Sequence, residues 1–226
     1  MCGRYSFSVK RDTVAAQLRG IYLERAPVIS YNIAPTQLAY VVTDAAPGIV
    51  QQFHWGLVPF WAKDVKIGAR LINARSETLW EKPAFREAAQ RRHCWVLADS
   101  FYEWKVVGGE RQPSRIQLQD ESIMIMAGIW ETWRLTEGQD PWHSFAIITC
   151  PSNREMREIH SRMPVILRGE TARAWLAAET PAVTQQLLQV PADGLLKMYP
   201  VSSRVNAVRN NDAGLHIRVG EQGSLF

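Results

Sequence analysis

The sequence predicts a single α+β domain, with a mixed or antiparallel sheet that curls toward a barrel and is flanked by helices. Strand-like segments follow one another along the middle of the chain more often than they alternate with helices, which is typical of this class. The chain has 226 residues, 46% of them hydrophobic and 21% charged, which suits one sizeable core. No repeat, low-complexity tract or linker divides the chain.

Local patterns assign the elements in order. Alternating or continuous apolar runs predict strands at residues 2–9, 38–43, 49–55, 94–98, 101–107, 114–118, 123–130 and 144–150. The pair Gly108 and Gly109 predicts a hairpin turn between two of these strands. Apolar residues at helical spacing predict helices at about 12–22, capped by Asp12, and at 84–92, 153–160, 170–178 and 182–189, the last after Pro181. Only the tail after about residue 214 is expected to pack loosely.

Composition excludes several classes of protein. No apolar run approaches the roughly 18 residues that span a bilayer, and the N-terminus lacks a basic and then apolar leader. We therefore expect no membrane partner, no secretion, and a cytoplasmic (nucleoid-associated) or nuclear location. A net charge of +4 permits a basic surface for nucleic acid without requiring one. Neither a GxGxxG nor a GxxxxGK[ST] motif supports a nucleotide fold.

The three cysteines form neither a disulfide framework nor a zinc motif. Cys94 and Cys150 lie in apolar, strand-like runs, so we expect both in the core. We expect no metal, no cofactor and a monomeric chain. Cys2 is left to explain.

Cys2 gains unusual chemistry once Met1 is removed, which methionine aminopeptidases permit before a small residue. Its α-amine and thiol, with unperturbed pKa values of about 8 and about 8.5, are then both partly nucleophilic near neutral pH. With an aldehyde, the amine can form an imine and the sulfur can close on the imine carbon to give a thiazolidine ring. With an amide, the sulfur can act alone with the amine as its base. A processed terminus without chemistry is the alternative.

Glu103 lies among aromatic residues in the segment SFYEWK. Strand alternation places Phe101 and Glu103 on one face of the strand. A buried carboxylate either pairs with a cation or has a raised pKa, and a raised pKa suits a general acid or base. The alternative is a salt bridge at a sheet edge.

Two further segments carry polar candidates. In LINARSET an extended backbone would point Asn73 and Arg75 the same way, so that the amide orients a reacting group while the guanidinium holds a phosphate. The alternative is a turn asparagine beside a surface arginine. In EIHSRMPVIL, His160 and Arg162 lie at the end of an element, where catalytic groups collect, although a single histidine is more often structural.

The segment WGLVPFWAKD places aromatic rings beside cations. Single-stranded nucleic acid binding uses rings that stack on bases and cations that follow the backbone. Most tryptophans belong to cores, so Trp61 and Phe60 are the candidates here for stacking.

Seven segments together resemble one family. These are MCGRYS, YNIAPTQ, WGLVPFW, LINARSET, FYEW, IHSRMPVIL and PVSSRVN, which span residues 1 to about 206. In this order they resemble the SOS-response-associated peptidase (SRAP) family, whose members shield abasic sites in single-stranded DNA. The chain departs from the family at Ser100, where glycine is usual.

The resemblance implies a single SRAP-like domain over residues 1–226 with a basic DNA-binding groove. It implies that Cys2 forms a thiazolidine with the ring-opened sugar, that Asn73 orients the sugar and Cys2, and that Glu103 and His160 transfer protons. It also implies contacts to DNA from Arg4, Arg75, Arg162, Trp61, Phe60 and Pro35. The expected partner is abasic single-stranded DNA, bound covalently, with lyase, crosslink-reversal and self-processing peptidase activities as further expectations.

Two other classes stay open. N-terminal-nucleophile glutamine amidotransferases also begin Met-Cys-Gly, but this chain has no Asn-Gly dipeptide of the kind that forms their oxyanion segment. A noncatalytic binder of modified DNA would make Cys2 incidental.

Overall fold

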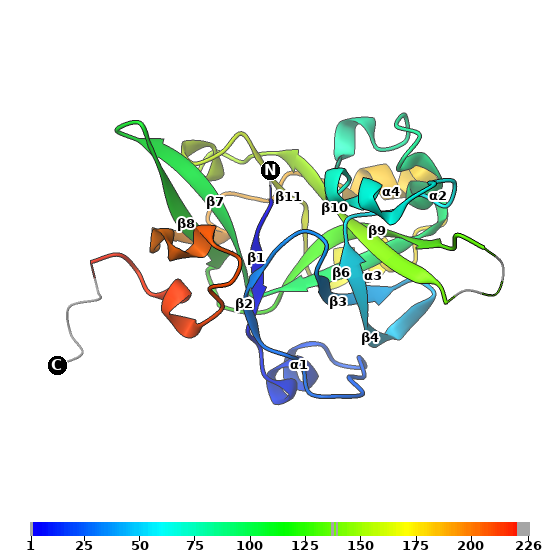
Figure 1. Cartoon of the computed structure of the whole chain (residues 1–226), viewed down its shortest axis with the longest axis horizontal. Helices are drawn as coiled ribbons and strands as arrows, with labels where there is room; N and C mark the ends of the chain where they lie inside the picture. Colours follow the sequence, from blue (N-terminus) through cyan, green and yellow to red (C-terminus); the bar gives the residue numbers. More distant parts are fainter. Residues whose placement is uncertain (1, 137, 139, 221–226) are drawn as a thin grey trace.

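Two β-sheets meet along a shared hydrophobic core in the computed structural model (Figure 1). The structure describes residues 2–136, 138 and 140–220. One sheet is entirely antiparallel and has the strand order β13-β8-β7-β1-β2. Its strands are β1 (Tyr5–Phe7), β2 (Ser30–Ile33), β7 (Ser100–Val107), β8 (Glu110–Leu118) and β13 (Leu196–Pro200).

The second sheet closes into a five-stranded barrel. Its strands are β3 (Leu38–Thr43), β4 (Ala46–Trp55), β6 (His93–Ala98), β9 (Met124–Trp133) and β10 (Trp142–Pro151). Neighbouring pairs in the order β4-β3-β6-β9-β10 are antiparallel, and a parallel pairing of β10 with β4 completes the ring. The predicted α+β class with a barrel-like mixed sheet is therefore confirmed.

Short strands extend the barrel at its edges. β5 (Asn73–Arg75) pairs in parallel with β10 beyond the point where β4 ends, and β11 (Arg162–Pro164) pairs with the end of β10. β12 (Ile166–Leu167) pairs with β9. The strand β5, which begins at Asn73, and the loop that carries His160 are therefore held at the same end of β10.

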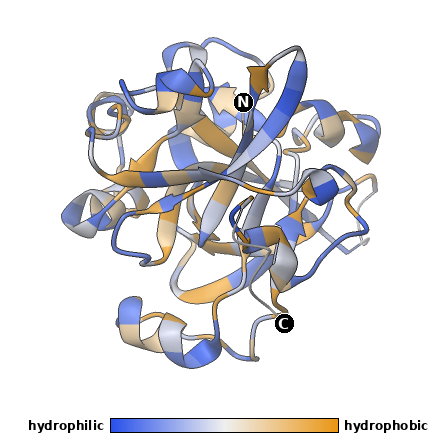
Figure 2. Cartoon of the chain, turned by 90° about the vertical axis from the view of Figure 1, so that its left-hand side faces the viewer, coloured by the Kyte–Doolittle hydropathy of each residue, from blue (hydrophilic) through white to orange (hydrophobic). Residues whose placement is uncertain are grey.

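Helices cover the outside of the two sheets. They are α1 (Arg11–Gln17), α2 (Arg86–Arg91), α3 (Gly169–Leu176) and α4 (Pro181–Leu187). Single 3₁₀ turns are η1 (Val65–Arg70), η2 (Ser76–Thr78), η3 (Met156–Glu158), η4 (Ser203–Asn206) and η5 (Ala213–His216). Hydrophobic stretches lie mainly along the strands and hydrophilic ones in the outer helices and loops (Figure 2). None of the helices in the described ranges is long and apolar enough to cross a bilayer.

Several expectations from sequence are confirmed. The hairpin turn at Gly108 and Gly109 joins β7 to β8, and Pro181 opens α4 after the N-cap Thr180. Cys94 and Cys150 are buried in the core. Strand alternation in β7 also holds, because Phe101 joins the main core while Tyr102 belongs to a second cluster on the other face.

Other expectations are wrong. The predicted helix at 153–160 contains only the turn η3, in which the backbone N–H groups of Glu158 and Ile159 bond three residues back, to Glu155 O and Met156 O. Asp12 lies in the first turn of α1 and is not its N-cap, which is Lys10. α1 also ends early, because the backbone N–H of Tyr22 bonds to Gly48 O beside β4.

The tail is packed as far as residue 220. Leu215 in η5 is buried in the second cluster with Tyr102, and Val201 forms a bridge with Arg218. The expectation of a loose tail after about residue 214 is therefore wrong for 215–220. Residues 221–226 lie outside the described residues.

Two loops of the barrel approach so closely that only glycine fits. Gly56, which follows β4 in the segment WGLVPFW, has φ of +128°. A Cβ at Gly56 would lie 2.5 Å from the carbonyl oxygen of Gly68, a backbone atom that cannot move aside easily. This contact fixes the chain that leads from β4 to Trp61.

We predict that Gly56→Ala destabilises the protein by about 3 kcal/mol, because it adds both backbone strain and a steric clash. Urea denaturation measures the change. Gly48→Ala is the matched control, because its Cβ would meet Gly20 O at an ordinary 3.7 Å. Equal effects of the two substitutions would contradict the packing argument.

Candidate active site

The pairing of β1 with β7 brings Cys2 next to Glu103. Tyr5 lies opposite Phe101, and the backbone N–H of Tyr102 donates to Arg4 O at 2.9 Å. Continuing this antiparallel register toward the N-terminus brings the chain at Cys2 level with the segment that holds Glu103. Both side chains are buried, with exposures of 0% for Cys2 and 3% for Glu103.

Asn73 reaches the same point from the barrel. The indole of Trp55 at the end of β4 donates to Ile72 O at 2.9 Å, and its ring contacts Tyr5 of β1 at 4.9 Å between centroids. Trp55 therefore fixes the start of β5 against the N-terminal strand. From there the Asn73 side chain donates from Nδ2 to Cys2 O at 2.7 Å. Its Oδ1 is buried and accepts no hydrogen bond from the described part of the chain.

The thiol of Cys2 is protonated at neutral pH in this environment. Burial, and secondarily the charge of Glu103, raises the pKa of the Cys2 thiol well above its ordinary value. A buried thiol of this kind is a poor nucleophile until a base removes its proton. Glu103 is the carboxylate whose charge the thiol senses, so it is placed to act as that base.

His160 lies on the loop between β10 and β11, after η3. Its Nδ1 lies 3.0 Å from the backbone N and 3.2 Å from the backbone O of Arg162, so it accepts from the N–H in one tautomer and donates to the carbonyl in the other. The loop is tied to β7 by an ion pair of 3.9 Å between Lys105 and Glu158. These two residues lie two positions from Glu103 and His160 respectively.

The three predicted phosphate-binding arginines occupy three different environments. Arg4 is half-buried and donates from Nη1 to Asn32 Oδ1 at 2.9 Å and to Val205 O at 2.8 Å. Arg162 forms a two-pronged ion pair with Glu77 and also donates to Thr149 O at 2.6 Å. Arg75 is exposed on β5. Of the three, only Arg75 is exposed.

The pair of Arg162 and Glu77 was not expected from the sequence. Hydrogen bonding from Arg162 lowers the pKa of Glu77 to about 2, so the carboxylate stays charged at any ordinary pH. Both groups therefore keep their charges at neutral pH, and a phosphate has to compete with Glu77 for the Arg162 guanidinium. The proximity of Glu77 to Arg162 had no signal in sequence, because 85 positions separate the two residues.

The predicted stacking residues are exposed. Phe60 and Trp61 have exposures of 56% and 49% and lie in a turn closed by a hydrogen bond from Ala62 N to Pro59 O. Pro35 is half-buried, and the next residue, Thr36, donates its N–H to Trp55 O at 2.7 Å. Pro35 is therefore held near the end of β4, from which the chain leads on to Trp61.

Within the described part of the chain, neither a cluster of metal-binding side chains nor a cavity beside α3 includes the predicted catalytic residues. No three His, Cys, Asp or Glu side chains within residues 2–136, 138 and 140–220 gather as a metal site would require. A cavity of about 500 Å³ lies beside α3 and is lined by residues that include Arg19, Trp95 and Arg173. It contains none of the predicted catalytic residues. The candidate active site is thus the junction of β1, β5 and β7.

We predict that Glu103→Gln lowers the pKa of the Cys2 thiol, because the substitution removes a negative charge that disfavours the thiolate. At each pH from about 7 to about 10, alkylation of Cys2 by iodoacetamide, followed by mass spectrometry, should therefore be faster than in the wild type, because a larger fraction of the thiol is ionised. Glu158→Gln, which removes an exposed carboxylate, is the control and should leave the curve in place. An unchanged curve for Glu103→Gln would contradict the prediction.

The chain resembles known proteins over nearly its whole length. It is 39% identical to the abasic site processing protein YoqW of Bacillus subtilis over 221 residues, which cover 95% of this chain and 98% of that protein. It is 34% identical to the abasic site processing protein HMCES of Gallus gallus, across 80% of this chain and 64% of that protein.

A solved structure has the same fold. A crystal structure of a protein from Bacteroides thetaiotaomicron matches with a TM-score of 0.86 and 28% identity, covering 96% of this chain and 99% of the other. The family model described as SOS response associated peptidase (SRAP) matches residues 1–208. The predicted resemblance is confirmed, and the chain belongs to the SOS response associated peptidase family.

Proposed function

We propose that this protein shields abasic sites in single-stranded DNA by forming a covalent thiazolidine through Cys2 after Met1 is removed. The observation that carries the proposal is the position of Cys2, buried beside Glu103 with its carbonyl held by Asn73 at 2.7 Å. The names of the relatives, which describe abasic site processing, also support it.

The chemistry begins with opening of the sugar, because an abasic site is mostly a closed hemiacetal. Proton transfer converts the hemiacetal to a free aldehyde, and the amine of Cys2 adds to the aldehyde carbon. Loss of one water gives the imine. The Cys2 sulfur then adds to the imine carbon while its proton passes to nitrogen, which closes a five-membered ring. Sulfur closure competes with β-elimination of the 3′ phosphate, so slow closure would appear as lyase activity.

Each polar residue has a separate part in this sequence. Glu103 takes the proton from the thiol, whose raised pKa makes such a base necessary. His160 donates a proton to the ring oxygen as the sugar opens. Asn73 holds the Cys2 backbone, and its unfilled Oδ1 accepts a hydrogen bond from the Cys2 amine or from a sugar hydroxyl.

The DNA is held by charge and by stacking. Arg4 and Arg75 bind phosphates, while Arg162 does so only when a phosphate displaces Glu77. Phe60 and Trp61 stack on bases next to the lesion, and Pro35 lines the bend in the strand. In this proposal, these residues line the basic DNA-binding groove that the family resemblance implies.

Removal of Met1 is required for this function, because Cys2 nitrogen is an amide while Met1 precedes it. We propose that the peptidase activity in the family name includes this self-processing step. Intact mass of the protein made in the presence of a methionine aminopeptidase inhibitor distinguishes self-removal from removal by another enzyme.

We predict that processed protein and an abasic single-stranded oligonucleotide give a conjugate that survives a denaturing gel. Cys2→Ser should retain at most a reversible imine that borohydride traps, because it lacks the sulfur that closes the ring. At saturating DNA, Asn73→Ala and Glu103→Gln should each slow formation of the conjugate on the order of a hundredfold. The first variant loses the positioning of Cys2 and the second loses the proton transfer.

The outcomes separate the competing classes. A band shift on a native gel without any conjugate on a denaturing gel would identify a noncatalytic binder. Release of ammonia from glutamine by the processed protein would favour the amidotransferase. Either result with confirmed removal of Met1 contradicts the proposed function.

We also predict that Arg75→Ala weakens binding to single-stranded DNA and reduces the slope of log affinity against log salt by about 0.7, the value expected for one lost phosphate contact. Fluorescence anisotropy at several salt concentrations measures this slope. Arg154→Ala, which removes an exposed arginine paired with Asp193, is the control. An unchanged slope for Arg75→Ala would show that Arg75 does not contact a DNA phosphate.

A further inference from the structure

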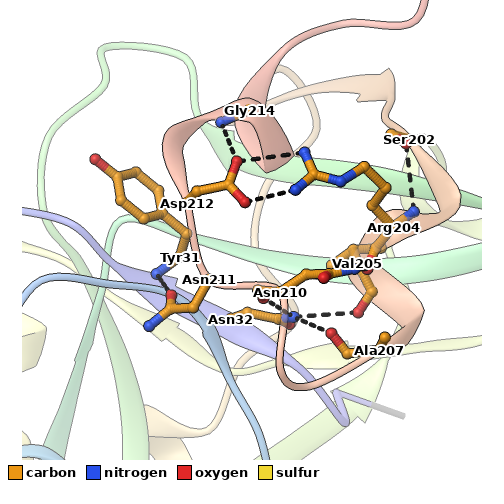
Figure 3. Close-up of polar contacts among 10 residues, drawn as sticks. All are labelled: Tyr31, Asn32, Ser202, Arg204, Val205, Ala207, Asn210, Asn211, Asp212 and Gly214. Carbon is orange, nitrogen blue, oxygen red and sulfur yellow. Dashed lines mark hydrogen bonds and ion pairs between the residues drawn. The ribbon is translucent and has the colours of Figure 1, made fainter.

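Asn32 joins three separate segments of the chain although its side chain has only 1% exposure. Its Nδ2 lies within hydrogen-bond distance of the carbonyl oxygens of Val205, Ala207 and Asn210, at 3.3, 3.2 and 2.7 Å (Figure 3). Its Oδ1 accepts from Arg4 Nη1 at 2.9 Å. The amide therefore links β2 both to the N-terminal strand and to the turn at 205–210. The function proposed above gives Asn32 no part.

The bonds to Arg4 determine which edge of its guanidinium is free. Both protons of Nη1 are taken, one by Asn32 Oδ1 and the other by Val205 O. The edge formed by Nε and Nη2 remains, and Nε is buried without an acceptor in the described part of the chain. Two parallel N–H groups on one edge are the arrangement by which a guanidinium binds a phosphate in two-pronged fashion.

The charge of Arg4 is also left without a protein counterion. Arg162 pairs with Glu77 and Arg204 pairs with Asp212, but none of the described carboxylates lies within ion-pair distance of Arg4. Burial lowers the pKa of Arg4, which means that its charged form is held at some cost. An anion bound at the free edge would offset that cost.

We propose that Asn32 is a positioning residue that turns the Nε and Nη2 edge of Arg4 toward a DNA phosphate, with the turn at 205–210 as its support. The turn is itself held from both sides. Arg204 pairs with Asp212 at 2.7 Å, and Asn211 Oδ1 accepts the Tyr31 N–H at 2.6 Å (Figure 3). The C-terminal segment thereby contributes to DNA binding without touching the DNA. This inference rests on the proposed function only in taking the phosphate from single-stranded DNA.

A double-mutant cycle tests the inference without any crosslinking chemistry. The probe is a fluorescent single-stranded oligonucleotide with a central tetrahydrofuran, an abasic analogue that has no aldehyde, and the readout is its dissociation constant by anisotropy. Asn32→Ala and Arg4→Ala should each weaken binding about tenfold, the effect of one lost charge-assisted hydrogen-bond pair. In the Arg4→Ala protein, Asn32→Ala should have no further effect. Gln189→Ala, which removes an exposed amide that donates to Gln186 O after α4, is the control and should bind like the wild type.

Additive losses from Asn32→Ala and Arg4→Ala would overturn the inference. Additivity would mean that Asn32→Ala weakens binding equally in the wild-type and the Arg4→Ala proteins, as a general loss of structure would. If thermal denaturation shows that Asn32→Ala does not fold, Arg4→Lys tests whether the two parallel donors of Arg4 are needed for binding. Lysine keeps the charge but has no edge of two parallel donors, so it should bind about as weakly as Arg4→Ala. Wild-type affinity in Arg4→Lys would overturn the inference.

The same experiment separates this inference from the proposed function. A wild-type protein that forms no conjugate with an abasic site but shows the coupling between Asn32 and Arg4 would contradict the covalent chemistry alone. A protein that forms the conjugate without that coupling would contradict the role of Asn32 alone. Absence of any binding to the probe would overturn the inference.

Discussion

The antiparallel pairing of β1 with β7 is the constraint on which the rest of the site depends. Chain ends usually fray, yet here Tyr5 is buried opposite Phe101 and packs its ring against Trp55 of the barrel. One short strand therefore joins the two sheets and carries Cys2 to their junction. Because the same Trp55 also holds Ile72 O, the barrel delivers Asn73 to Cys2 through a rigid connection. A residue near the chain terminus thus acquires the fixed geometry of a core residue.

Burial determines the protonation state of the Cys2 thiol. The raised pKa of the Cys2 thiol limits reaction with unrelated electrophiles, while Glu103 is close enough to influence that pKa and to accept the proton. The arginines around the site are specialised in a similar way. Glu77 neutralises Arg162, Asn32 orients Arg4, and Arg75 stays open to solvent. Residues of one type therefore differ in availability because their neighbours differ.

Sequence predicts much of this fold where patterning is local. The strand Leu38–Thr43 and the hairpin at Gly108 and Gly109 follow from alternation and turn chemistry alone. Prediction from sequence fails where residues far away in the chain determine the secondary structure. The strand Leu196–Pro200 forms because it pairs with β8, and the segment 153–160, predicted as a helix, forms only a 3₁₀ turn before β11 pairs with β10. The chemical candidates Cys2 and Glu103 are visible in sequence, whereas their proximity to each other and to Asn73 depends on strand register. Asn32 lies within the motif YNIAPTQ, but only its contacts with Arg4 and with the turn at 205–210 indicate a role for it.

The most direct test of the account is the chemical state of Cys2 in the conjugate with abasic DNA. After denaturation and digestion, tandem mass spectrometry should locate the sugar remnant on the N-terminal peptide that begins with Cys2, at the summed mass less one water. The thiol of that residue should resist alkylation, because ring closure occupies both its nitrogen and its sulfur. A remnant on a lysine, or a Cys2 thiol that alkylates freely in the conjugate, would contradict the account.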